Sequence, residues 1–144
     1  MSAALAVATN VANITIAGAA AAALYLAWRQ IGISRELSAL EAYENYHMMC
    51  LQYPQFSNGN VDFEGFDKIE LSQYTVYVLY TLMMVERIHA LFPNDEGWRF
   101  SICDDIRMHK KFIASEVFSR HLANQQWAIL PLIMTVLRED ACEE

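Results

Sequence analysis

The sequence carries the same spacing of a carboxylate and an imidazole twice. Glu44 and His47 lie in "ENYH", and Glu86 and His89 lie in "ERIH". Residues three apart share one face of an α-helix, and two such pairs facing each other across a helical bundle can hold two metal ions. The spacing raises the hypothesis of a di-iron or di-manganese carboxylate protein with these four residues as ligands.

A complete di-metal site of this kind needs two further carboxylates. The ferritin-like arrangement takes a bridging Glu from each of two other helices. The rest of the chain offers Asp105 before His109 and Glu116 before His121, which do not repeat that arrangement. Both Glu-x-x-His pairs also lie near expected helix ends, where a His interacts favourably with the helix dipole without binding anything. We therefore prefer structural roles for both pairs and expect no cofactor.

Other signatures of chemistry are missing from the sequence. It contains no Gly-rich phosphate loop, nucleophile elbow, His-Glu-x-x-His or Cys-x-x-Cys motif. Cys50, Cys103 and Cys142 are odd in number, which argues against a disulfide framework. The net charge of −7 argues against nucleic acid as a partner, because an acidic surface repels phosphates. These absences favour a protein that is not an enzyme.

The opening of the chain is set apart by its charge, because the first 28 residues contain no Asp, Glu, Lys or Arg. This stretch is long enough to cross about 30 Å of hydrocarbon at 1.5 Å per residue. We predict one transmembrane helix in residues 1–30, in contact with membrane lipid. Because positive residues stay inside, the N-terminus is expected outside and the rest of the chain in the cytoplasm. The predicted interfacial anchors are Tyr25, Trp28 and Arg29.

Two alternatives to a membrane span follow from the same residues. A secretory signal peptide would carry a basic region before its apolar stretch, and this sequence has none. A soluble, buried helix rich in Ala is the other alternative, because Ala contributes little to membrane insertion. The transmembrane interpretation is preferred over both.

The composition of the predicted span favours contacts with other helices. Gly18 and Ala22 form a small-xxx-small pair, which lets a neighbouring helix approach closely. Asn10 and Asn13 are polar groups that need hydrogen-bond partners in lipid. We expect these four residues to pack against other membrane-protein subunits or copies of the same chain. A homo-oligomeric pore lined by the two Asn residues and Thr9 is an alternative.

Residues 31–144 are predicted to form a cytoplasmic bundle of three to four helices, so that the fold class is all-α. Helical spacing of apolar residues and flanking prolines place helices at 33–53 and 67–92, with a loop rich in Pro, Asn and Gly at 54–66. A third helix is opened by Asn94 or Asp95. A closing segment spans 121–140, in which Pro131 is expected to kink the helix or begin a new one.

Helical periodicity also predicts the faces that point to the core. The helix at 33–53 has one apolar stripe, and the third helix has another. The first stripe is Ile33, Leu37, Leu40, Met48 and Leu51, in line with Glu44 and His47; the second is Trp98, Ile102, Ile106, His109 and Ile113. In the helix at 67–92, His89 continues the line of Leu71, Val78, Leu82 and Val85, with Glu86 at its edge. The many Tyr and Met residues at similar spacing are interpreted as core or interface.

One part of the sequence resembles a known group of proteins. It consists of the stretch "YTVYVLYTLMMVERIHAL", the acidic cap "NDEGW" and an Ile/Phe-rich helix. From Tyr74 to Ile133 the chain resembles uncharacterised bacterial proteins with one N-terminal membrane helix and a small cytoplasmic helical domain. The resemblance implies that architecture and no activity.

The expected function is that of a membrane-anchored assembly or accessory module, a non-catalytic subunit of a larger membrane complex. A helix suited to membrane contacts and a domain rich in aromatic residues and Met both favour interaction over chemistry. The homo-oligomeric pore or effector and the di-metal protein remain the alternatives.

Overall fold

A computed structural model describes residues 2–59, 61–124 and 126–139, with side chains at 9–10, 12–59, 61–123 and 126–138. Throughout these ranges the regular structure is helical, which confirms the all-α prediction. The chain divides into two compact units, Met1–Ser38 and Ala39–Glu144. Cys142 and the end of the predicted closing segment at Asp140 lie outside the described residues.

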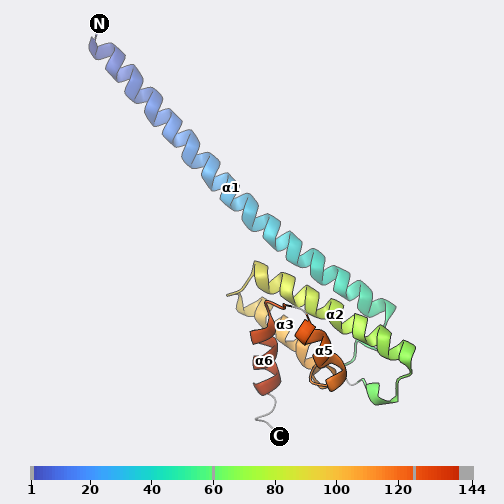
Figure 1. Cartoon of the computed structure of the whole chain (residues 1–144). Coiled ribbons are helices and arrows are strands. Elements are labelled where there is room, and N and C mark those ends of the chain that lie inside the picture. Colours follow the sequence, from blue (N-terminus) through green and yellow to red (C-terminus); the bar gives the residue numbers. More distant parts are fainter. Residues whose placement is uncertain (1, 60, 125, 140–144) are drawn as a thin grey trace. The chain divides into compact units, whose positions relative to one another are not determined.

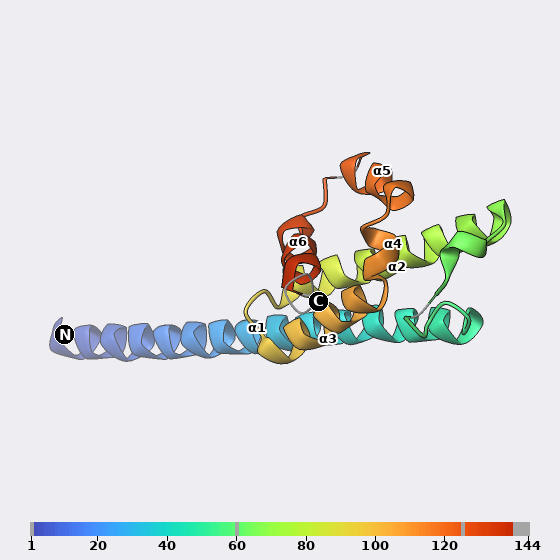
Figure 2. The ribbon, with the colours of Figure 1, turned by 90° about the horizontal axis from the view of Figure 1, so that it is seen from below.

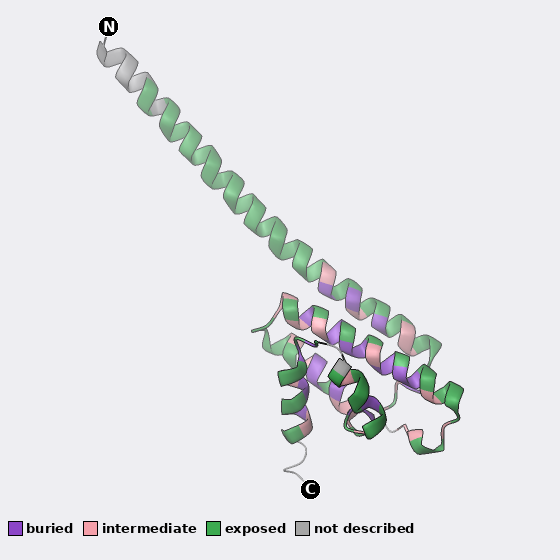
Figure 3. Cartoon of the chain, viewed as in Figure 1, coloured by how far each residue is buried: buried purple, intermediate pink, exposed green. Residues whose placement is uncertain are grey.

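Helix α1 runs from Ser2 to Gln52 and joins the two stretches that the sequence assigned to a membrane helix and a first cytoplasmic helix. Pro54 follows soon after its end, as expected. Among the described residues, α1 is the one helix long and apolar enough to cross a membrane, judged by length and composition. In the first unit every described side chain from Ala12 to Leu37 is exposed, and Figure 3 shows this stretch in green.

The second unit contains the end of α1 and all the later helices (Figure 1). Their bounds are η1 Phe63–Gly65, α2 Lys68–Leu91, α3 Glu96–Met108, α4 Lys110–Ile113, α5 Glu116–Asn124 and α6 Leu130–Glu139. The end of α1 runs antiparallel to α2, because Glu41 pairs with Arg87 while Cys50 contacts Tyr77. Within the same unit α2 packs against α3, and α3 against α6 (Figure 2).

The helix ends follow the capping signals in the sequence. Asp67 accepts hydrogen bonds from the backbone N–H groups of Ile69 and Glu70, and the Glu70 carboxylate accepts one from the Asp67 N–H, which completes a capping box. The Asp95 carboxylate accepts a hydrogen bond from the Trp98 N–H and caps the N-terminus of α3. Of the two predicted caps, Asn94 and Asp95, the structure therefore uses Asp95. Pro131 lies in the first turn of α6, so it begins a new helix and does not kink a longer one.

The predicted loop 54–66 turns at Gly59. Gly59 has a φ of +68°, in the left-handed region that favours glycine. A Cβ at this position would also lie 3.2 Å from the Met108 backbone. Phe56 and Phe63 lead from the loop into the core, where their rings pack on Tyr74 and Phe112.

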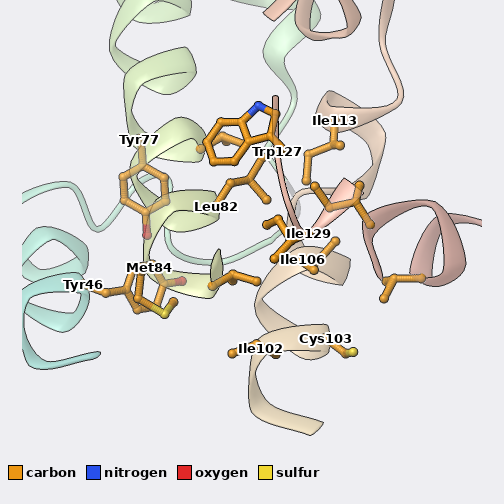
Figure 4. Packing of buried hydrophobic residues seen from close by; sticks show 14 of the residues in the cluster. Tyr46, Tyr77, Leu82, Met84, Ile102, Cys103, Ile106, Ile113, Trp127 and Ile129 are labelled. Atoms are coloured by element: carbon orange, nitrogen blue, oxygen red, sulfur yellow. The ribbon is translucent and has the colours of Figure 1, made fainter. Parts of the chain in front are cut away.

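The core of the second unit is built mainly by α2, α3 and the segment that leads into α6. Figure 4 shows their buried side chains gathered together, among them Leu82, Ile106, Trp127 and Ile129. The predicted stripe of α3 is confirmed for Ile102, Ile106, His109 and Ile113, while Trp98 is half-buried. Of the predicted line on α2, Val78, Leu82 and Val85 are buried, and Leu71 and His89 are half-buried.

The stripe predicted for the end of α1 is wrong. Leu40, Met48 and Leu51 are exposed, as Ile33 and Leu37 are in the first unit. Helix α1 instead presents Ala39, Ala42 and Tyr46 to the core. The two alanines have short side chains and leave room for the bulky side chains of the opposite helices, a packing effect that hydrophobicity alone does not predict.

Candidate functional site

Glu44 and His47 lie on the part of α1 that belongs to the second unit, and both are exposed. The imidazole of His47 packs on the ring of Tyr43, with centroids 4.6 Å apart. The prediction that both side chains point inward is therefore wrong, because α1 faces the core with Ala39, Ala42 and Tyr46.

Glu86 has a structural role at the other Glu-x-x-His pair. Its Oε1 accepts a hydrogen bond of 2.7 Å from the backbone N–H of Ala128. This bond ties α2 to the segment that leads into α6 and satisfies a backbone donor outside any helix. His89 is half-buried in the last turn of α2, the position that the helix dipole favours for a His.

The two pairs do not assemble into one metal centre. Within the described residues, which include all four predicted ligands, no group of three or more His, Cys, Asp or Glu side chains could hold a metal ion. Each Glu lies three residues before its His on one helix, as predicted. However, Glu44 and His47 of α1 are exposed, and the Glu86 carboxylate binds a backbone amide.

Besides two threonines of α2, the buried polar side chains of the described residues are Asp105 on α3 and His109 at its C-cap, exposed by only 3% and 1%. They are four residues apart and so lie on the same helix face. The Tyr74 hydroxyl is 3.0 Å from His109 Nδ1. Burial lowers the pKa of His109 to about 4, so the imidazole is neutral at pH 7.

Asp105 faces α1 and the Tyr46 hydroxyl donates a hydrogen bond to its carboxylate. Burial raises the pKa of Asp105 to about 6, against the opposing effect of that hydrogen bond. The pKa values of Tyr46 and Tyr77 are also raised, chiefly by burial. Cys50 Sγ lies 3.0 Å from the Tyr77 hydroxyl and completes a polar cluster between α1, α2 and α3.

Three buried polar atoms of the described chain have no hydrogen-bond partner: Asp105 Oδ2, His109 Nε2 and Trp127 Nε1. Leaving buried polar atoms unpaired costs stability. Sequence reasoning placed His109 on the core stripe but missed Asp105. The available signal was its position next to Ile106 and four residues before His109, on the edge of the same stripe.

The surface of the second unit is hollowed between the end of α1 and α2. One hollow of about 190 Å³ is lined by Met49, Tyr53, Ser72, Gln73, Val76 and Tyr77. A second of about 130 Å³ is lined by Ala42, Asn45, Tyr80, Met83, Met84 and Arg87. Half of each lining consists of Met and Tyr, side chains that suit protein interfaces.

A third hollow, of about 310 Å³, lies between α3 and α6. Its lining combines Glu96, Arg99 and Arg107 with the exposed ring of Phe100. Both charge signs therefore occur in this lining.

The residues predicted for the membrane helix lie in the first unit, and all of them are exposed: Asn10, Asn13, Gly18, Ala22, Tyr25, Trp28 and Arg29. A Cβ on Gly18 would meet no atom within 4 Å. The rings of Tyr25 and Trp28 are 6.4 Å apart and form one aromatic pair beside Arg29.

No protein-family model, curated protein or solved structure matches this chain.

Proposed function

We propose that the N-terminal part of α1 anchors this chain in a membrane as a single span. The observation that supports anchoring is the exposure of a charge-free, apolar helix whose described side chains from Ala12 to Trp28 are all uncovered. A helix that is apolar all round is stable only when protein or lipid covers it. Arg29 directly after the span favours an N-terminus outside and a cytoplasmic second unit.

The second unit is proposed to act as a non-catalytic assembly module, a helical bundle that binds another membrane-protein subunit. The support is an exposed stripe on α2: Ile69, Val76, Tyr80 and Met83. These residues follow one another at intervals of seven, four and three, so they share one face. Val76, Tyr80 and Met83 also line the two hollows beside α1. A helix of the partner laid along this face would cover all four.

We expect Ala20→Asp to release the chain from the membrane fraction. A carboxylate at the centre of a span adds about 2.5–3.5 kcal/mol to the cost of insertion. The measurement is extraction of whole membranes with alkaline carbonate, followed by immunoblotting. Ser34→Asp, which lies beyond Arg29 on the same helix, is the matched control and should stay in the pellet. Extraction of the unsubstituted chain by carbonate would refute anchoring.

The assembly proposal predicts a foreign subunit that depends on the α2 stripe. The chain is extracted from native membranes in nanodiscs, and the mass of the intact particle is determined. We expect Val76→Asp to reduce a stoichiometric foreign subunit at least about tenfold, because a buried carboxylate without a partner is costly at an interface. Phe100→Asp, at an exposed apolar position on α3, should keep that subunit.

Particles that contain only copies of this chain would contradict the assembly proposal. So would a foreign subunit that Val76→Asp leaves in place. Elemental analysis of the same particle tests the di-metal alternative, and conductance in planar bilayers tests the pore.

A further inference from the structure

The end of α1, residues 39–52, makes a small apolar contact with the rest of the second unit. Its buried side chains are Ala39, Ala42 and Tyr46. Two of these three are alanines, and burying an alanine removes little apolar area from water. The free energy that keeps this segment closed on α2 and α3 therefore depends strongly on its polar contacts.

One polar contact of this segment is buried and crosses to α3. The Tyr46 hydroxyl donates a hydrogen bond to the carboxylate of Asp105, which is itself buried. Within the described chain, Asp105 Oδ2 has no hydrogen-bond partner. An ionised carboxylate costs far more to bury than a neutral carboxyl unless several donors bind it. The closed segment therefore favours the protonated form of Asp105.

The neighbouring titratable groups do not offset the charge of an ionised Asp105. Asp104 raises the pKa of Asp105 further, and His109 is neutral at pH 7 because burial lowers its pKa to about 4. None of the surrounding groups carries a positive charge at pH 7. They are Tyr43, Tyr46 and Cys50 from α1, Tyr77 from α2, and Asp104 and His109 from α3 and its C-cap.

The chain has a hinge directly after this segment. Helix α1 ends at Gln52, and Pro54 follows. Phe56 is buried and packs on Tyr74 of α2, so the chain is fixed to the core again just beyond the proline. Helix α2 packs on α3, and α3 on α6, without help from residues 39–52. The end of α1 is therefore the element whose release disturbs the rest of this core least.

We propose that residues 39–52, named here the α1 latch, close on α2 and α3 when Asp105 is protonated and swing away about Pro54 when it is ionised. In the open form water hydrates the carboxylate, and the face of α1 that carries Ala39, Ala42 and Tyr46 is uncovered. Figure 4 shows Tyr46 beside Tyr77 of α2, the contact that opening separates. The latch belongs to the second unit and depends neither on the membrane anchor nor on the partner proposed above.

Opening of the latch differs from complete unfolding in the buried groups that it exposes. Asp105 bonds to Tyr46 of α1, whereas His109 contacts Tyr74 and Tyr77 of α2. Opening therefore hydrates Asp105 and leaves His109 between α2 and α3. The pH dependence of opening follows Asp105 alone, while complete unfolding exposes both groups.

The first test is hydrogen exchange of the full chain in nanodiscs, measured by mass spectrometry on peptides from residues 39–52. Exchange rates are compared with those of an unfolded reference at the same pH, and the ratio is the protection. We expect the protection of the latch to fall about tenfold from pH 5 to pH 7.5, because the pKa of Asp105 is about 6 in the closed form and returns to its ordinary 3.8 in water. Peptides from α3 should stay better protected at both pH values.

Three variants show which group controls the latch. Asp105→Asn imitates the protonated carboxyl, so its latch should change in protection by less than about twofold between the two pH values. His109→Asn and Asp104→Asn should both keep the fall near tenfold. A fall in Asp105→Asn as large as in the unsubstituted chain would overturn the latch. So would a fall that appears only in His109→Asn, or equal protection of α1 and α3 peptides, because exchange would then occur by complete unfolding.

The second test removes the hydrogen bond between the latch and Asp105. Tyr46→Phe keeps the ring and deletes the donor. Its latch should lose at least about three times more protection at pH 7.5 than at pH 5, because a hydrogen bond to a charged group is worth more than one to a neutral group. Tyr80→Phe, at a half-buried tyrosine of α2, is the control and should change neither value. An equal loss at both pH values would mean that Tyr46 acts by packing alone, which contradicts the proposal.

Discussion

Tyr74→Ala is expected to lower the free energy of unfolding of the second unit by about 3–5 kcal/mol, the usual cost of removing a large buried side chain. Tyr74 is 1% exposed, and its ring packs on Phe56, Phe66, His109 and Phe112. Since whole domains are stable by about 5–15 kcal/mol, this loss is a large share of the total. The measurement is urea unfolding of the full chain, followed by tryptophan fluorescence.

Two matched variants separate packing from hydrogen bonding at this position. Tyr74→Phe keeps the ring but removes the hydroxyl that lies 3.0 Å from His109 Nδ1. It should cost about 1–3 kcal/mol, because a buried polar nitrogen loses its partner. Tyr80→Ala, at a tyrosine that is 38% exposed on the same helix, should cost less than about 1 kcal/mol. Equal effects of Tyr74→Ala and Tyr80→Ala would contradict the described core.

The second prediction concerns how stability depends on pH. Asp105 has a pKa of about 6 in the folded chain, above its ordinary 3.8. Its contribution to the free energy of unfolding is therefore fully present below pH 3.8. That contribution is lost as the pH rises to 6, a change of about 3 kcal/mol. His109 has a pKa of about 4, below its ordinary 6.5. Its contribution is present above pH 6.5 and is lost as the pH falls to 4, again by about 3 kcal/mol.

The two contributions have opposite slopes over nearly the same range, so they largely cancel between pH 4 and 6. Replacing one residue should reveal the slope of the other. Asp105→Asn is expected to lose about 3 kcal/mol of stability as the pH falls from 6.5 to 4, because only the His109 effect remains. His109→Asn should show the opposite trend and lose stability as the pH rises from 3.8 to 6.

The measurement is the urea midpoint of each variant at intervals from pH 3.5 to 7.5. Each midpoint is taken relative to that of the variant that carries both Asp105→Asn and His109→Asn. That comparison removes the titration of exposed carboxylates, which all variants share. Asp104→Asn, next in sequence but exposed, is the control and should follow the unsubstituted chain closely, because Asp104 contributes only a lesser charge effect to the pKa of Asp105. Parallel pH profiles for the two single variants would show that Asp105 and His109 are not buried as described.

The polar cluster consists of two hydrogen-bonded pairs of side chains. Tyr74 on α2 pairs with His109 at the end of α3, and Tyr46 on α1 pairs with Asp105 on α3. The α2 stripe, the surface proposed to bind a partner, shares no residue with this cluster.

Much of the local structure was determined by the sequence itself. The charge-free opening, the bounds of α2 and the start of α3 followed from charge, apolar periodicity and capping residues. Pro54, Pro93 and Pro131 marked the helix boundaries. These features are local because a cap or a proline acts on backbone groups within one helical turn.

Tertiary structure decided which face of each helix is buried in the core. Periodicity placed Leu40 and Leu51 inside, but the fold buries Ala39 and Ala42, because the space between packed helices is limited and small side chains fit it. It also buried Asp105, which its charge would place at the surface, and it turned Glu44 and His47 outward, away from Glu86 and His89. A residue's spacing determines its neighbours on its own helix, but only the packing of other helices determines whether that face is covered.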